Sequence, residues 1–356
     1  MKYLLGFLLV LCLTGCSLAP NEYLSVTPHT DSTTQLSDST ALTAENYLSL
    51  KNAILRLVRT GQTDGVIRVV NYDGDVESDL AKAAYEVRKL DPLGAYAVDY
   101  MTHSCTQIVS YYEIRINMTF RRSPMDIAQI SLAPTDDHLK SQLQVAVNRS
   151  AERLTVQMDS YRDQAQIVPD LVAEHCAANP DLVMEVPTVS VQVYPDIGST
   201  RIMEIEFSYT NTTEELQEKQ QAVQENLHAA AEYIRYRSGD LEKAQLLYTY
   251  LTERFQYTAA ETATPLYDAL CSGVADPTGL SQAWQQILEL AGVECYTVTG
   301  LKNGEPYTWN IFRTGGYYRH LDLARCVLQG GAPLFLTDWD MSNYYWNTEL
   351  YPACVP

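Results

Sequence analysis

The chain has 356 residues, a length that suggests about two domains of roughly 150 residues each. Hydrophobic residues make up 46% and charged residues 19%, a composition typical of globular proteins and unlike that of disordered or collagen-like chains. Acidic residues outnumber basic ones by 44 to 25, for a formal net charge of −19, which argues strongly against nucleic-acid binding.

The N-terminus has the pattern of an export signal. An apolar run from Tyr3 to Leu13 follows Lys2; it is too short to span a bilayer but long enough for a signal-peptide core. It ends in Leu13-Thr14-Gly15-Cys16, which resembles the lipobox of bacterial lipoproteins. In that family a diacylglycerol is attached to the cysteine and the chain is cut just before it. The resemblance implies a signal peptide over residues 1–15 and an extracytoplasmic protein anchored to the bacterial membrane, inner or outer, through Cys16. An ordinary signal peptide with an incidental cysteine is the alternative.

Residues 16–44 are expected to form a flexible tether. They are rich in Ser, Thr and Asp and poor in apolar residues, so they cannot bury a core.

Residues 45–130 and 131–212 follow the same course of strand, helix and later strand. Both later strands alternate apolar and polar residues, which is typical of a strand with one buried face. We interpret the two stretches as diverged copies of a small α+β unit, with chance similarity as the alternative. In the first copy the expected elements are a strand over Val66–Tyr72, a helix capped by Ser78 and ended by Asp91-Pro92, and a strand over Tyr112–Phe120; in the second they are Leu154–Tyr161, Asp170–Ala178 and Met203–Tyr209.

A long helix is expected to connect this duplicated region to a C-terminal domain. It opens at Thr213, carries apolar residues at helical spacing and ends at Ser238-Gly239, and another helix starts at Asp240. The connecting helix thus takes residues 213–239, and the last domain takes residues 240–356.

The last domain carries a series of short motifs in a fixed order. They are Tyr267-Asp268-Ala269-Leu270, Gly279-Leu280-Ser281, Ala291-Gly292-Val293, Gly300, Trp309-Asn310, His320-Leu321-Asp322 and Tyr351-Pro352-Ala353-Cys354. Through these positions the domain resembles the transglutaminase-like domain of bacterial exported proteins, a branch of the papain-like cysteine fold. The resemblance implies a helix beginning within a residue or two of Pro277 and packed on an antiparallel sheet formed by residues 293–322. The whole chain is therefore expected to be α+β.

The catalytic positions that the resemblance implies depart from the family. Pro277 occupies the position of the nucleophilic cysteine and Tyr307 that of the histidine, and only the aspartate, Asp322, is retained. The family's chemistry requires a thiolate, an imidazole that takes its proton, and a carboxylate that orients the imidazole. The triad is therefore expected to be inactive, with Tyr307 and Asp322 remaining as hydrogen-bonded neighbours.

The cysteines leave one enzymatic alternative open. Six remain besides Cys12 and Cys16, none in a CxxC or zinc-like spacing, so neither a metal nor a cofactor is predicted and disulfide pairing stays undetermined. A cysteine hydrolase or transferase with a shifted site, Cys271 and His320, is the alternative. The six are Cys105, Cys176, Cys271, Cys295, Cys326 and Cys354.

The leading functional hypothesis is a non-catalytic binding module for a peptide, a protein or a wall polymer. Trp284 and Trp309 are expected in the core, and the candidate binding surface consists of Trp339, Tyr344, Tyr345 and Trp346. A third possibility is a structural lipoprotein in which the duplicated region carries the binding site.

Overall fold

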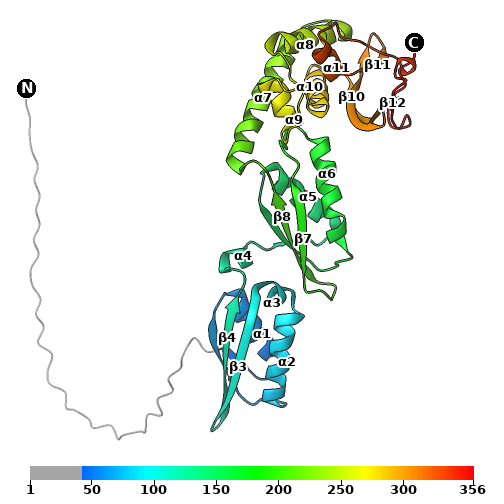
Figure 1. Ribbon diagram of the computed structural model, residues 1–356. Helices are drawn as coiled ribbons and strands as arrows, with labels where there is room; N and C mark the ends of the chain where they lie inside the picture. Colours follow the sequence, from blue (N-terminus) through cyan, green and yellow to red (C-terminus); the bar gives the residue numbers. More distant parts are fainter. Residues whose placement is uncertain (1–41) are drawn as a thin grey trace, which may run out of the picture. The chain divides into compact units, whose positions relative to one another are not determined.

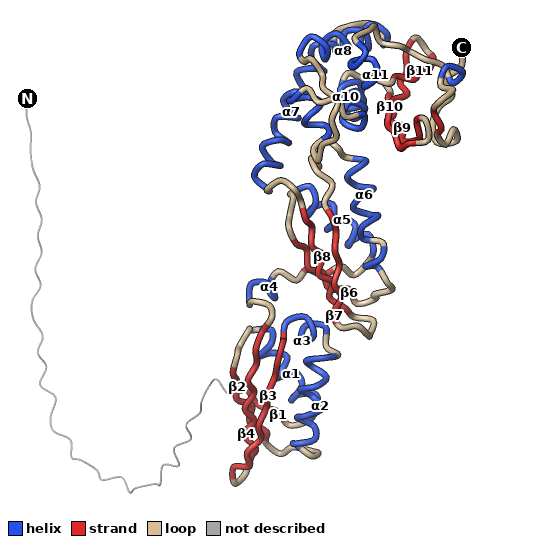
Figure 2. Tube along the Cα trace, in the orientation of Figure 1, coloured by secondary structure: helices blue, strands red, loops and turns tan. Residues whose placement is uncertain are grey.

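The computed structural model describes residues 42–356, which contain both helices and sheets and are α+β as expected (Figures 1 and 2). The predicted signal peptide, Cys16 and most of the predicted tether lie outside the described residues. Within residues 42–356 no helix is both long and apolar enough to cross a membrane.

The first α+β unit is a four-stranded sheet with helices packed against it. Its strand order is β1-β2-β4-β3, in which β1 pairs parallel with β2 and the other pairs are antiparallel. Ile114, Ile116 and Met118 alternate along β4 into the core, as the sequence pattern predicted. The elements are β1 (Leu42–Ala44), α1 (Tyr47–Arg59), β2 (Asp64–Val69), α2 (Val76–Lys89), α3 (Pro92–Ala97), β3 (Val98–Ile108), β4 (Tyr111–Phe120) and α4 (Pro124–Ala128).

The second unit has the same topology. Its strand order is β5-β6-β8-β7, again with one parallel pair, β5 with β6. Val156 pairs with Met203 as Ile67 pairs with Ile114, at the same separation along the chain. This correspondence is what two diverged copies would show. The elements are β5 (Ser131–Leu132), α5 (Asp136–Asn148), β6 (Arg153–Met158), η1 (Gln164–Gln166), α6 (Val168–Ala178), β7 (Thr188–Tyr194) and β8 (Arg201–Ser208).

The C-terminal part begins with two helices and ends in a third sheet, of strand order β11-β10-β9-β12, with antiparallel pairs throughout. The expected helix starts at Thr213, Asp240 and Pro277 are confirmed, and so is the sheet after residue 293. The elements are α7 (Thr213–Arg235), α8 (Asp240–Arg254), α9 (Pro265–Tyr267), the π-helical turn η2 (Asp268–Ser272), α10 (Pro277–Leu290), β9 (Cys295–Lys302), β10 (Glu305–Thr314), β11 (Tyr317–Leu321), α11 (Leu323–Gln329), η3 (Asp338–Asp340) and β12 (Tyr344–Tyr345).

The third sheet is covered on both faces. On one face α10 packs on β10 and β9, and Trp284 meets Phe312 edge to face with ring centroids 5.8 Å apart. On the other face Trp309 and Ile311 pack under residues of the C-terminal segment, Met341, Tyr344 and Cys354. Both Trp284 and Trp309 are fully buried, as predicted.

Backbone hydrogen bonds anchor the end of that segment. The amide of Asp338 donates to the carbonyl of Cys354 (2.9 Å), and the amide of Cys354 donates to the carboxylate of Asp338 (3.1 Å). The far face of the sheet is therefore covered by the last residues of the chain.

Two predictions about the first unit are wrong in detail. Leu42–Ala44 were assigned to the tether, but they form β1 and bury Ala44 against β2. Ser78 does not cap α2; the carboxylate of Asp75 accepts from the amides of Glu77 (3.0 Å) and Ser78 (3.2 Å), so the helix begins at Val76.

Candidate functional site

The helix α10 begins at a proline. Asp276 caps the helix by accepting from the amides of Thr278 (2.7 Å) and Gly279 (3.2 Å), and Pro277 is the first helical residue. A proline fits there because the first helical N–H has no partner within the helix. The helix start is thus kept and capped, while the position implied for the cysteine holds a side chain without a reactive group.

Asp322 forms the centre of the polar cluster at this site. It lies where β11 ends and caps α11, and it is only 2% exposed. One carboxylate oxygen accepts from the Tyr307 hydroxyl (3.0 Å) and the Arg325 amide (2.9 Å); the other accepts from the Tyr344 hydroxyl and Lys302 Nζ, both at 2.6 Å. Four donors thus offset the cost of burying this charge.

The predicted contact between Tyr307 and Asp322 is therefore confirmed. Tyr307 projects from β10, and Asp322 directly follows the neighbouring strand β11. A tyrosine hydroxyl can donate where an imidazole N–H would donate in the family, so the hydrogen bond does not depend on catalysis.

The cluster holds Tyr307 in its protonated form. Burial, together with the adjacent negative charge of Asp322, raises the pKa of Tyr307 far above its ordinary value of 10.0. Lys302 Nζ lies over the ring of Tyr307, 4.2 Å from its centroid, and forms an ion pair with Asp322. Tyr307 cannot act as a general base near neutral pH in this environment.

His320 is fully buried and its tautomer follows from its partners. Trp309 Nε1 donates to His320 Nδ1 (3.0 Å), and because an indole N–H can only donate, Nδ1 must accept. The proton of the neutral ring is then on Nε2, which donates to Asp338 (2.8 Å).

The same tautomer argues against a metal site here. The ligand atoms of His320, Asp338 and Cys354 lie within 4.8 Å of one another. However, a metal would bind the lone pair of His320 Nε2, which carries the ring proton here. Moving this proton to Nδ1 would place it opposite the N–H of Trp309, so two donors would face each other. Burial also raises the pKa of the Cys354 thiol to about 12, which disfavours a thiolate ligand. The three residues form a hydrogen-bonded cluster.

The structure does not bring Cys271 and His320 together. Cys271 packs in the core on the α10 side of the sheet, where its sulfur accepts from Asn226 (3.4 Å). His320 pairs with Ile311, which faces the opposite side. Burial raises the pKa of Cys271, and all six cysteines within residues 42–356 are free thiols.

Two residues of the predicted binding surface are exposed and two are not. Trp339 is 85% and Tyr345 63% exposed. Tyr344 is only 7% exposed, because its hydroxyl binds Asp322 and its ring packs edge to face on Trp309, so its assignment to the surface was wrong. Trp346 is half-buried between Trp309 and His320.

Lys302 is the site residue that sequence reasoning missed. It is the last residue of β9, before the Asn303-Gly304 turn, and belongs to no motif. Its contact with Asp322 depends on the pairing of three strands, which the sequence pattern around Lys302 does not reveal.

The chain has similarity to solved structures but not to curated protein sequences. No protein-family model and no curated protein sequence matches the chain. Among solved structures it is similar to a crystal structure of a TGase, at 10% identity and a TM-score of 0.25, over 55% of this chain and 59% of that one. It is also similar to a candidate protease from Parabacteroides distasonis, at 8% identity and a TM-score of 0.22, over 72% of this chain and 39% of that one. The chain thus spans less than two thirds of the length of either protein.

We predict that Tyr307→Phe destabilises the C-terminal domain by about 2 kcal/mol, because it removes a donor from a buried carboxylate. All four tryptophans lie after residue 240, so denaturant unfolding followed by tryptophan fluorescence reports on this domain alone. Tyr318→Phe is the matched control, since its hydroxyl binds the exposed Glu294 (2.7 Å), and it should leave the unfolding midpoint unchanged. Equal effects of the two substitutions would contradict the assigned role of Asp322.

We also predict that the domain loses stability as the pH falls below 6.5. Burial lowers the pKa of His320 in the folded state, although the nearby Asp338 opposes this. Because the unfolded chain keeps a histidine pKa near 6.5, it binds the proton first as the pH falls. The stability provided by the neutral ring is thus complete above about pH 6.5 and is lost as the pH falls through the folded-state pKa.

His320→Gln should flatten this profile below about pH 6.5, measured as the fluorescence-detected unfolding midpoint. A variant that kept the slope of the wild type would show that His320 is not the group responsible.

Proposed function

We propose that the protein is an extracytoplasmic lipoprotein, anchored through Cys16, whose transglutaminase-like C-terminal domain binds a ligand and does not catalyse a reaction. The ligand classes that suit this proposal are a peptide, a protein or a wall polymer.

The order of elements supports the transglutaminase-like assignment. A helix that begins at Pro277 packs on antiparallel strands, β10 presents the position implied for the histidine, and Asp322 follows the next strand. These are the relations that the sequence resemblance implies.

The chemistry of the three positions supports a non-catalytic role. Pro277 has no nucleophile, Tyr307 is held protonated, and both oxygens of Asp322 already accept from donors within the chain. The other thiol considered, Cys271, has a raised pKa and lies away from His320. The contact between Tyr307 and Asp322 carries this proposal most directly, because it fills the place in which an imidazole would have to act.

Exposed aromatic residues support binding. Trp339, flanked by Asp338 and Asp340, and Tyr345 present large rings to solvent. Such rings are enriched where proteins recognise partners, because they combine a large apolar area with a polar tip.

Lipidation is tested by metabolic labelling of bacteria that express the full chain with a palmitate analogue. The wild type should be labelled and Cys16→Ser should not, because the thiol is the point of attachment. Cys12→Ser is the matched control and should be labelled like the wild type. Labelling of Cys16→Ser at the wild-type level would refute the anchor.

Catalysis is tested with assays for transamidation, deamidation and peptide hydrolysis. The wild type should show no turnover above Cys271→Ala, since triad groups act as a unit and two are missing. Turnover by the wild type that Cys271→Ala abolishes would instead support the enzyme with the shifted site.

Binding is tested by co-sedimentation of the purified protein with bacterial cell-wall sacculi. Trp339→Ala and Tyr345→Ala should each weaken binding by about tenfold, as expected for an aromatic anchor at a binding surface. Tyr236→Ala removes an 82% exposed ring at the end of α7 and should have no effect. Failure of the wild type to sediment would remove the wall polymer as a ligand.

A further inference from the structure

The first α+β unit contacts the exposed end of the second sheet. Helix α3 lies against β7 and β8. Tyr96 of α3 meets Tyr194 of β7 edge to face, with ring centroids 5.6 Å apart, and Ile202 of β8 is buried in the hydrophobic core of the first unit. Apolar side chains of α3, β7 and β8 thus meet at this junction.

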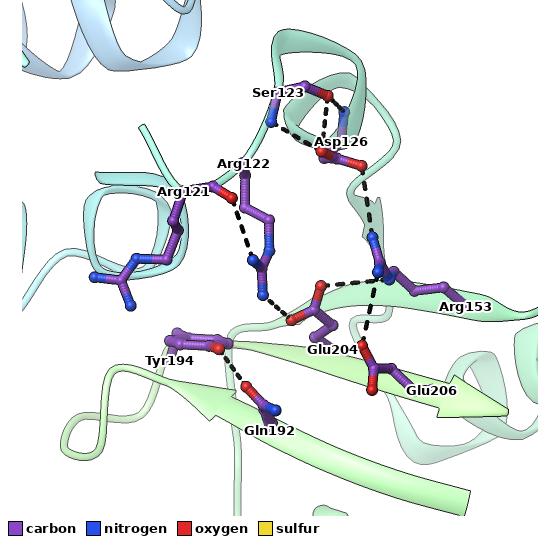
Figure 3. A network of polar contacts seen from close by, with 9 residues as sticks. All are labelled: Arg121, Arg122, Ser123, Asp126, Arg153, Gln192, Tyr194, Glu204 and Glu206. Atoms are coloured by element: carbon purple, nitrogen blue, oxygen red, sulfur yellow. Dashed lines mark hydrogen bonds and ion pairs between the residues drawn. The ribbon is translucent and has the colours of Figure 1, made fainter. Parts of the chain in front are cut away.

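A buried ion pair lies beside these apolar contacts (Figure 3). Arg122, in the segment between β4 and α4, donates to the carboxylate of Glu204 on β8. The side chain of Glu204 is only 1% exposed and that of Arg122 21%. The guanidinium of Arg122 also lies over the ring of Tyr96, 5.2 Å from its centroid. Breaking such a pair by removing one partner is costly, because the other charge stays buried.

The pair is incompletely satisfied. Among the described residues, Arg122 Nε and Glu204 Oε1 are buried and lack a hydrogen-bond partner. A buried network that is only partly satisfied is less stable than its number of charges suggests. The junction therefore holds two opposite charges, with one guanidinium nitrogen and one carboxylate oxygen left without a hydrogen bond.

Arg153 gives Glu204 a second partner within its own unit. Its Nε lies 3.5 Å from Glu204, and another guanidinium nitrogen lies 3.6 Å from Glu206, the residue paired with Arg153 across the two strands. It also reaches Asp126 of α4, at 3.7 Å. Because Arg153 and Glu204 both belong to the second sheet, separation of the two units would leave Glu204 hydrated and still paired.

The first sheet does not have this arrangement. The strand pairing places Arg115 where the second sheet has Glu204, and Arg115 binds Glu113 on its own strand at 3.0 Å. The carboxylate that binds Arg122 is therefore present on the second sheet and has no counterpart on the first sheet.

We propose that Arg122 and Glu204 form a releasable latch that holds the first unit on the second. In the closed state Arg122 binds Glu204. In the open state both charges are hydrated, Arg153 stays with Glu204 and Glu206, and the segment around Arg121 to Asp126 becomes accessible. Loss of either partner would leave the other charge buried in the closed state, which favours opening, and Arg153 keeps Glu204 paired once the units separate.

Limited proteolysis of the full-length protein with trypsin tests the latch, because Arg121 and Arg122 are themselves cleavage sites in this segment. Glu204→Gln keeps both sites and the shape of the side chain but removes the charge, and it should accelerate cleavage there at least tenfold. Arg122→Met keeps the site at Arg121 and should accelerate cleavage there to a similar extent. Sites in the C-terminal domain, such as Lys243 and Arg254, should be cut no faster than in the wild type.

Glu206→Gln is the matched control, since it changes the neighbouring carboxylate on the same face, which contacts Arg153 but not Arg122. It should be cut like the wild type. Unchanged cleavage in both Glu204→Gln and Arg122→Met would overturn the proposal, as would equal acceleration in Glu206→Gln. If Glu204→Gln were cut throughout the chain, it would be unfolded, and Arg122→Met would decide.

Discussion

The buried carboxylate of Asp322 is the interaction on which the C-terminal domain depends. It accepts hydrogen bonds from hydroxyl groups of β10 and of the C-terminal segment, from an ammonium group at the end of β9 and from a backbone amide of α11. One negative charge thus connects β9, β10, α11 and the C-terminal segment. Removing it would leave Lys302 without its partner and α11 without its cap.

Buried carboxylates also hold the junctions between the chain's units. Glu204 receives Arg122 where the first unit meets the second. Glu185, 6% exposed, accepts from Thr210 and from the amide (3.1 Å) and side chain (2.7 Å) of Asn211, where β8 leads into α7. Asn211 in turn accepts from Lys219 of α7 (3.0 Å). An acidic chain has many carboxylates to place, and here three of them organise the fold from inside.

Local patterns predicted elements whose two faces differ, and failed elsewhere. The strand β4 and the helix starts at Thr213, Asp240 and Pro277 could be identified because burial follows a short period. The sequence of β8 alternates in the same way, but its residues from Ile202 to Ile205 are all buried, because Ile202 and Glu204 contact the first unit. The edge strand β3 was missed, since most of its side chains are exposed and no alternation marks it. Helix α1 was missed although its buried residues do recur at helical spacing. Lys302 and the pair of Arg122 with Glu204 were beyond reach, because such contacts depend on tertiary structure.

The covering of the third sheet by the chain's last residues bears on how the protein is made. Synthesis proceeds from the N-terminus, so β10 is made well before Cys354. Until then one face of the sheet, with Trp309 and Ile311, has no apolar cover, and Asp322 lacks the Tyr344 hydroxyl. The two α+β units can complete their cores while the chain is being made, whereas the C-terminal domain stays open and vulnerable to aggregation or proteolysis until the segment with Tyr344 and Cys354 has been added.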